Sequence, residues 1–358
     1  MSNLPRVQRL WLAASEGNLE LVKELASDRA VDVNWCDAEF QRTPFYRACF
    51  YGHRGVVEYL LGHPRVDVTL IQSQGCSPFF IACQNGHVKV VSVLLADPRI
   101  DVNQKTQHEA SPFFIACQNG HVEVVTLLLG YFRIEVNSPK NLGISPFYIA
   151  CENGQTGVVA QLLTDPRIEV NCLAEDRTSP LWLATQNGHI DIVRMMMASE
   201  RVIETRVVCT FNRRTAAEQG RAMGLRTMGL QGEEEHLRKK INGPLIADLI
   251  GEYEEDREAV SLRLRCLPGI REHFVARTFA LVVFFADGYL RLGQRSPAII
   301  TRFLWICARL PQDLQMVLCH RMFGSVKDVI LSKESEPGFR WLARPTTLWE
   351  ETKVWDTQ

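Results

Sequence analysis

Residues 111–137 read SPFFIACQNGHVEVVTLLLGYFRIEVN, and this stretch decides the fold because it recurs along the chain. Its start is repeated every 34 residues, as Thr-Pro at 43–44 and as Ser-Pro at 77–78, 145–146 and 179–180. A fixed period of this length indicates that each repeat is one supersecondary element, which can bury its apolar face only against its neighbours. The sequence therefore predicts a stacked array whose function lies on an extended surface.

Each repeat is expected to contain two helices and a loop. Ser111 can cap the first helix with its hydroxyl, Pro112 suits the first turn, and Gly120 suits a left-handed residue that ends the helix. The apolar stripe at 124, 125, 128 and 129 predicts a longer amphipathic helix. The short β-branched stretch 133–137 leads into a polar segment, so a hairpin-like loop should return the chain to the next Ser-Pro.

The copies agree at many independent positions. The short helices read TPFYRACFYGH from Thr43, SPFFIACQNGH from Ser77 and Ser111, SPFYIACENGQ from Ser145 and SPLWLATQNGH from Ser179, after a first copy, LAASEGN, from Leu12. This pattern resembles the ankyrin repeat over more than half of the chain. The resemblance implies an all-α fold, an ankyrin-repeat solenoid of helix-turn-helix units with hairpin loops.

Beyond the sixth repeat the register slips, although residues 215–217 and 244–250 resemble a short and a long helix separated by an insertion. We predict a solenoid over 6–256, including a split capping repeat over 215–256, and a small C-terminal helical domain over 257–358. Within this domain, helices are expected at 270–290, 297–309, 311–323 and around 339–349.

Two features depart from the family pattern. The family histidine near the start of the short helix is replaced by aromatic residues, so aromatic packing should substitute for its hydrogen bonds. These residues are Tyr46, Phe80, Phe114, Tyr148 and Trp182. The loop after the long helix is one residue longer and often reads Asp-Pro-Arg, as at 97–99 and 165–167.

Composition argues against several classes of function. Lys and Arg total 40 and Asp and Glu total 41, so no overall charge favours nucleic acid. The start lacks a secretory signal, and the most apolar stretch, 279–286, is too short to cross a membrane. Four cysteines, Cys49, Cys83, Cys117 and Cys151, share one repeat position that packing explains better than metal ligation. We expect a cytoplasmic or nuclear protein without a metal or cofactor.

The resemblance places partner binding on the concave face, which the hairpin tips and the outer side of the short helices form. The predicted partner-binding residues are Phe40, Arg42, Phe50, Tyr51, Gln84, Asn85, Gln118, Asn119, Glu152, Asn153, Gln186 and Asn187. The aromatic residues Phe40, Phe50 and Tyr51 are the expected anchors. Alternatively, the Gln-Asn pairs recur through duplication and are merely solvated. The histidines at 53, 87, 121 and 189 are interpreted as structural parts of the family pattern.

The sequence thus predicts a non-catalytic protein-interaction module or scaffold whose partner is another protein. A second hypothesis is a ubiquitin-ligase substrate receptor, because the segment from Leu310 resembles the start of an F-box. Contact with the ligase scaffold would then involve Leu310, Pro311, Leu314 and Leu318. An enzymatic tail is not favoured, since its ionisable residues lack the spacing of a nucleophile, a base and an orienting group.

Overall fold

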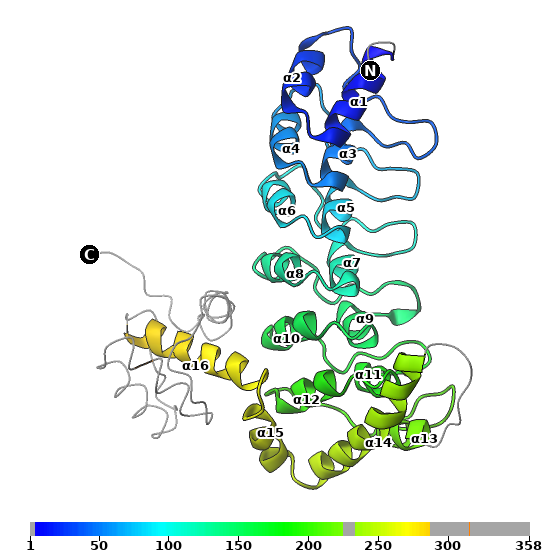
Figure 1. The fold of residues 1–358 in the computed structure, drawn as a ribbon, viewed down its shortest axis with the longest axis vertical. Helices are drawn as coiled ribbons and strands as arrows, with labels where there is room; N and C mark the ends of the chain where they lie inside the picture. The colour runs from blue at the N-terminus through cyan, green and yellow to red at the C-terminus, as the bar shows by residue number, and fades with distance from the viewer. Residues whose placement is uncertain (1–3, 225–232, 287–314, 316–358) are drawn as a thin grey trace. The chain divides into compact units, whose positions relative to one another are not determined.

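The computed structural model describes residues 4–224, 233–286 and Gln315. Six helix pairs follow one another, and we number them as repeats 1 to 6 (Figure 1). The pairs are α1 (Arg6–Glu16) and α2 (Leu19–Ser27), α3 (Pro44–Tyr51) and α4 (Arg54–Leu61), α5 (Pro78–Gln84) and α6 (Val88–Leu95), α7 (Pro112–Asn119) and α8 (Val122–Leu129), α9 (Pro146–Glu152) and α10 (Thr156–Thr164), and α11 (Pro180–Gln186) and α12 (Ile190–Ala198). The described residues form no β-strand, only an isolated bridge between Lys140 and Ile144. The predicted all-α solenoid is confirmed.

The chain divides into two compact units. The first holds the residues up to Val193 together with 202–250, and the second holds 194–201 together with the residues from Gly251 onward. Helices α12 and α14 (Glu233–Glu255) each contribute to both units. The domain boundary at 256 stays a prediction.

Each short helix from repeat 2 onward begins at a hydroxyl cap. The Thr43 side chain accepts a hydrogen bond from the Tyr46 amide at 3.1 Å, and Ser111 accepts one from the Phe114 amide at the same distance. Proline follows each cap, where its missing N–H removes no helical bond. Gly120 ends α7 with φ at 78°, the left-handed conformation that glycine adopts without strain. The predicted start and end signals are therefore confirmed.

The core is continuous from repeat to repeat. The equivalent leucines of the long helices, Leu60, Leu94, Leu128 and Leu162, are all 0% exposed. The four cysteines that share one repeat position are also 0% exposed, which confirms that they pack in the interior. Burial raises the pKa of the Cys117 and Cys151 thiols well above the usual range, so both stay uncharged.

The aromatic residues that replace the family histidine are buried in every repeat from 2 to 6. Tyr148 also keeps a polar link to the next repeat, because its hydroxyl lies 2.6 Å from Thr178 Oγ1. Burial raises the pKa of Tyr148 to about 12, so the hydroxyl remains neutral. Aromatic packing thus substitutes for the imidazole, as expected, and one hydrogen bond survives.

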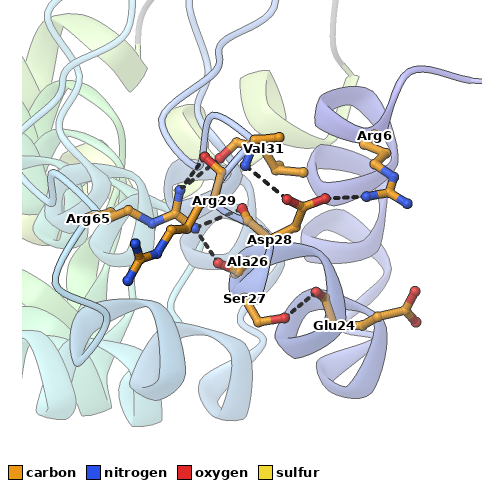
Figure 2. A network of polar contacts seen from close by, with 9 residues as sticks. Arg6, Glu24, Ala26, Ser27, Asp28, Arg29, Val31 and Arg65 are labelled. Carbon is orange, nitrogen blue, oxygen red and sulfur yellow. Dashed lines mark hydrogen bonds and ion pairs between the residues drawn. The ribbon is translucent and has the colours of Figure 1, made fainter.

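The longer loop after the long helix connects neighbouring repeats through its arginine. Figure 2 shows the Arg65 guanidinium reaching back to the end of α2, where it donates to the carbonyls of Ala26 and of Asp28, the latter at 3.0 Å. Arg99 Nη2 likewise donates to the Leu61 carbonyl at 2.7 Å, and Arg167 Nη2 to the Leu129 carbonyl at 2.7 Å. A cation at a helix C-terminus also interacts favourably with the helix dipole.

The aspartate of the Asp-Pro-Arg loop holds this arginine in place. Asp97 pairs with Arg99 at 2.6 Å, and the buried Asp165 pairs with Arg167 at 2.8 Å. The hydrogen bond from Arg99 holds the pKa of Asp97 below its usual range. The arginine of the lengthened loop therefore lets repeats 2, 3 and 5 cap the long helix before them.

The array continues into α13 (Ala216–Gly224), which packs against α11. Thr215 and Glu218 form a reciprocal cap: the Thr215 amide donates to Glu218 Oε2 at 2.8 Å, and the Glu218 amide donates to Thr215 Oγ1 at 3.3 Å. Gly220 lies against α14, because a Cβ there would lie 2.5 Å from the Gly243 carbonyl oxygen.

Helix α14 is longer than the predicted helix, which was expected to begin at Pro244. It begins at Glu233, so part of the charged insertion is helical and Pro244 lies inside the helix. An ion pair at 2.5 Å between Glu235 and Lys239, one turn apart, supports this added segment.

In the second compact unit, α15 (Arg257–Arg265) binds the end of α12. Ser261 Oγ donates to the Met197 carbonyl at 2.6 Å, and Arg265 Nε donates to the Ala198 carbonyl at 2.8 Å. These two side chains of α15 thus cap the end of α12, as the loop arginines cap earlier long helices. Helix α16 (Arg271–Ala286) agrees with the first helix predicted for the tail. Except for the helical Gln315, the later predicted helices and the F-box-like residues Leu310, Pro311, Leu314 and Leu318 lie outside the described residues.

Candidate protein-binding surface

Loops that we call fingers precede α3, α5, α7, α9, α11 and α13 and project from one side of the helix pairs (Figure 1). Their residues are 35–42, 69–76, 103–110, 137–144, 171–178 and 205–214. Each tip turns at a residue with positive φ, for example 57° at Gln41 and 80° at Gly75. Because few residues other than glycine adopt this conformation, it marks a tight turn at each tip.

Backbone hydrogen bonds join successive fingertips. The Ser73 amide donates to the Phe40 carbonyl at 3.0 Å, and the Gln107 amide donates to the Gln74 carbonyl at 3.2 Å. The Glu175 amide donates to the Leu142 carbonyl at 3.0 Å, and the Thr210 amide to the Asp176 carbonyl at 2.9 Å. The fingertips and the outward residues of the short helices form the finger face, which is the candidate surface.

A ladder of side-chain hydrogen bonds connects the ends of the short helices. Asn119 Nδ2 and His121 Nε2 both bind the Gln84 carbonyl, at 2.9 and 2.7 Å. The same pair of bonds runs from repeat 3 to the Phe50 carbonyl and from repeat 6 to the Glu152 carbonyl. In repeat 5, Gln155 Nε2 takes the place of the histidine and donates to the Gln118 carbonyl at 3.1 Å. The histidine positions therefore link repeats.

Close packing accompanies each rung of the ladder. A Cβ on Gly52 would lie 2.6 Å from His87 Nδ1, and one on Gly86 would lie 2.6 Å from His121 Nδ1. The final rung comes from α14, because Asn242 Nδ2 donates to the Gly188 carbonyl at 2.8 Å. The glycines are required both for their positive φ and for the imidazole that packs against them.

The predicted asparagines therefore have a structural function. Asn85, Asn119, Asn153 and Asn187 each donate to a carbonyl of the preceding repeat. The neighbouring Gln84, Gln118, Glu152 and Gln186 are partly buried, and Glu152 has a pKa raised by burial. Gln186 Oε1 accepts from Gln219 Nε2 at 2.5 Å. Whether these residues also contact a partner stays a prediction.

The predicted aromatic anchors belong to a cluster at repeats 1 and 2. Phe50 and Tyr51 meet edge to face, with ring centroids 4.9 Å apart. The Arg47 guanidinium lies 4.2 Å from the centroid of the Trp11 ring and 4.7 Å from that of Tyr51. We call Trp11, Arg42, Arg47, Phe50 and Tyr51 the aromatic–arginine cluster.

Arg42 joins this cluster through its backbone, because Trp11 Nε1 donates to the Arg42 carbonyl at 2.8 Å. Its guanidinium lies 4.0 Å from the centroid of the Phe40 ring. The structure thus brings four predicted residues, Phe40, Arg42, Phe50 and Tyr51, to one end of the finger face.

Sequence reasoning missed Trp11 and Arg47. Arg47 stands where the other repeats have an aliphatic residue, such as Ile81 and Ile115, so its charge interrupts the repeat pattern. Trp11 occupies in repeat 1 the slot that Tyr46 fills in repeat 2. It is only partly buried, whereas Tyr46 is buried. Comparing each repeat position for exceptions would have singled out Arg47, whereas Trp11 fits the aromatic pattern of its slot and differs only in its exposure.

Two fingertips carry exposed apolar side chains. Leu142 on the fourth finger is 61% exposed, and Phe211 on the sixth is 87% exposed. Leu142 follows the hairpin-tip pattern, whereas Phe211 lies where the register of the sequence is lost. Single exposed apolar side chains are common on protein surfaces, so these two residues serve as positions at which variants can test binding by the fingers.

The described residues contain no group of three or more His, Cys, Asp or Glu side chains placed to hold a metal ion. Within the same residues, no helix combines the length and the apolar character needed to cross a membrane.

Comparison with known proteins identifies the repeats. A family model described as "Ankyrin repeats (3 copies)" matches residues 10–106 and 113–207, which is more than half of the chain. The crystal structure of the ankyrin repeat domain of Bcl-3, a unique member of the IkappaB protein family, is similar with a TM-score of 0.52 and 21% sequence identity. That match covers 59% of this chain and 92% of the Bcl-3 chain. No curated protein matches the sequence. The chain belongs to the ankyrin-repeat family.

Proposed function

We propose that this protein is a non-catalytic interaction module that binds another protein on its finger face. The proposal rests on one observation: the residues that hold the repeats together differ from the apolar residues that are exposed on the finger face. The ladder and the core hold the repeats together, whereas Tyr51, Leu142 and Phe211 present apolar surface to solvent on the same side. Ankyrin repeats generally bind other proteins, which supports this assignment.

Order in the fingers favours binding. Because the tips are hydrogen-bonded to one another and turn at residues of positive φ, little conformational entropy is lost when a partner docks. Aromatic and arginine side chains, which the cluster at repeats 1 and 2 supplies, are the residue types most often found at binding hot spots. The proposed surface therefore combines a rigid frame with suitable anchors.

The buried thiols support a location in a reducing compartment. Cys49, Cys83, Cys117 and Cys151 serve packing, and such use of cysteine suits the cytoplasm or the nucleus.

The test is affinity capture from the native cell with the full chain, followed by variants of two faces. Leu142→Asp and Phe211→Asp place charge on the fingertips, whereas Lys89→Glu and Ser92→Glu change the exposed side of α6 as a matched control. We expect the fingertip variants to lose the captured protein and the α6 variants to retain it. If only the α6 variants lose the captured protein, the partner binds outside the finger face and the proposal is rejected.

A further inference from the structure

The aromatic–arginine cluster has the composition of an anion-binding site, and we infer that it receives a carboxylate from an acidic segment of the partner protein. This inference rests on the proposed function, because it assumes that the finger face binds a protein. It goes further by stating the chemistry of the partner and the place where that chemistry is recognised.

Arg47 is held in one orientation by the residues around it. Arg47 Nε donates to Ser15 Oγ at 2.9 Å, and Arg47 Nη2 donates to the Tyr51 hydroxyl at 3.0 Å. Ser15 Oγ in turn donates to the Trp11 carbonyl at 2.8 Å. Together with the rings of Trp11 and Tyr51, these bonds fix the guanidinium before any ligand arrives. Prior ordering of this kind lowers the entropy lost on binding.

The bonds leave donors for a ligand. A guanidinium carries five N–H groups, and neutral acceptors among the described residues engage only Nε and Nη2. Aromatic rings cover the face of a guanidinium and leave its edge, which matches the two oxygens of a carboxylate. Because the Tyr51 hydroxyl accepts from Arg47, its own proton remains available to an anion. Tyr51 is 44% exposed, so this position is open to solvent.

No ion pair among residues 4–224 joins the Arg42 or Arg47 guanidinium to a carboxylate. Asp37 is the carboxylate nearest to Arg42 along the finger, but it accepts the backbone amides of Phe40 and Arg42, at 2.6 and 3.3 Å, and not the guanidinium. Some arginines elsewhere in the array are paired, as Arg54 is with Glu58 and Arg167 with Asp165. A partly buried cation without a counter-ion gains more from an incoming carboxylate than a fully solvated one does.

The surroundings favour a protein segment over a free ion. Phe40, Phe50 and Tyr51 supply apolar contact area next to the guanidinium groups. A peptide with an acidic side chain beside an apolar one would use both features at once, whereas a small anion would use only the charge.

The experiment is a selection of random peptides displayed on phage against the full chain, followed by binding measurements with the selected peptides. We expect enrichment of Asp and Glu beside apolar residues. Arg47→Met should weaken binding by about tenfold or more, because one charge-assisted hydrogen bond is lost. Arg54→Met, which removes the same charge from α4 in the same repeat, should leave the affinity unchanged. Replacing the peptide's Glu by Gln should match the loss, and replacing it by phosphoserine shows whether phosphate binds as well.

Several results would overturn the inference: no peptide selected, no acidic enrichment, equal affinity for the Glu and Gln forms, tighter binding of phosphoserine than of Glu, or equal binding to Arg47→Met and the native chain. Thermal melting of Arg47→Met separates loss of binding from loss of folding, and Arg47→Lys, which keeps the charge but not the planar fork, provides a second variant. If Leu142→Asp and Phe211→Asp abolish partner capture while Arg47→Met does not, the proposed function stands and this inference alone fails.

Discussion

Repeat 2 and the repeats that follow it use the same helix position in opposite ways. In repeats 3 to 6, the residue before the helix-ending glycine is an asparagine that donates to the preceding repeat, as Asn119 does to Gln84. In repeat 2 this residue is Tyr51, so the Ser15 carbonyl receives a hydrogen bond from His53 but none from position 51. The Tyr51 ring instead packs with Arg47 and Phe50. The same position thus links repeats in most of the array and exposes an aromatic ring at one end.

Core substitutions should destabilise repeat 2 and the later repeats by similar amounts. Leu128→Ala should destabilise the fold by about 2–5 kcal/mol, because the truncation removes a fully buried side chain and leaves a cavity between repeats. Leu60→Ala, at the equivalent site of repeat 2, should cost a similar amount, and Leu142→Ala on the exposed fingertip should cost little. Chemical denaturation of the three variants measures these differences. A large cost for Leu142→Ala with a small one for Leu128→Ala would invert the assignment of faces.

The contact between repeat 2 and repeat 3 depends on Gly52, which packs against His87. Gly52→Ala should destabilise the protein by about 1–3 kcal/mol, since the backbone has φ at 75° and the new Cβ would meet the His87 ring. Gly62→Ala is the matched control, because Gly62 has φ at −80° and a Cβ there would lie 3.6 Å from its nearest neighbour, the Glu58 carbonyl oxygen. Equal melting temperatures for the two variants would show that the imidazole packing is unimportant.

A single rung of the ladder should have a smaller effect. Asn119→Ala removes one of the two donors to the Gln84 carbonyl and should cost about 0.5–1.5 kcal/mol. Gln118→Ala changes the adjacent side chain but keeps the backbone acceptor that repeat 5 uses, so it should cost almost nothing. If both variants unfold at the denaturant concentration of the native chain, the ladder is dispensable in the middle repeats.

The weakest expected effect is a change in pH dependence at the last histidine rung. Burial lowers the pKa of His189 below its ordinary value of 6.5. As the pH falls through that value, the unfolded chain takes up the proton before the folded chain does, so stability decreases. His189→Gln copies the natural Gln155 of repeat 5, and it should keep a bond to Glu152 while flattening the fall in melting temperature.

His108→Gln, at an exposed fingertip, is the control for this measurement. An unchanged pH profile in His189→Gln would remove His189 from the explanation. His63, whose pKa is also lowered by burial, leaves a residual dependence of the same sign.

Sequence alone was sufficient for most of the fold, because it follows from local signals. The hydroxyl cap at Ser111, the following proline and Gly120 each act within one turn of helix, so they can be read without knowing the neighbours. Helix α14 was harder: its charged first half has no apolar stripe, and Pro244 favoured a later start.

The candidate surface was only partly predictable, because its contacts join different repeats. Phe50 and Tyr51 could be identified as anchors, but the position of Trp11 beside Arg47 depends on how repeat 1 packs on repeat 2. Likewise, Asn119 was interpreted as either partner-binding or solvated, whereas it bonds to a carbonyl 35 residues earlier. These contacts depend on how one repeat is aligned against the next, and the sequence of a single repeat does not determine that alignment.

The direction of the capping bonds has a consequence for how the protein is made. Arg99 and Arg167 reach back to helices that precede them in the chain, as do the side chains of the ladder. Each repeat is therefore completed by the one that leaves the ribosome after it, and a nascent chain always ends in a repeat whose carbonyls await partners. Asn242 in turn can provide the last rung only when nearly all of the array has been translated.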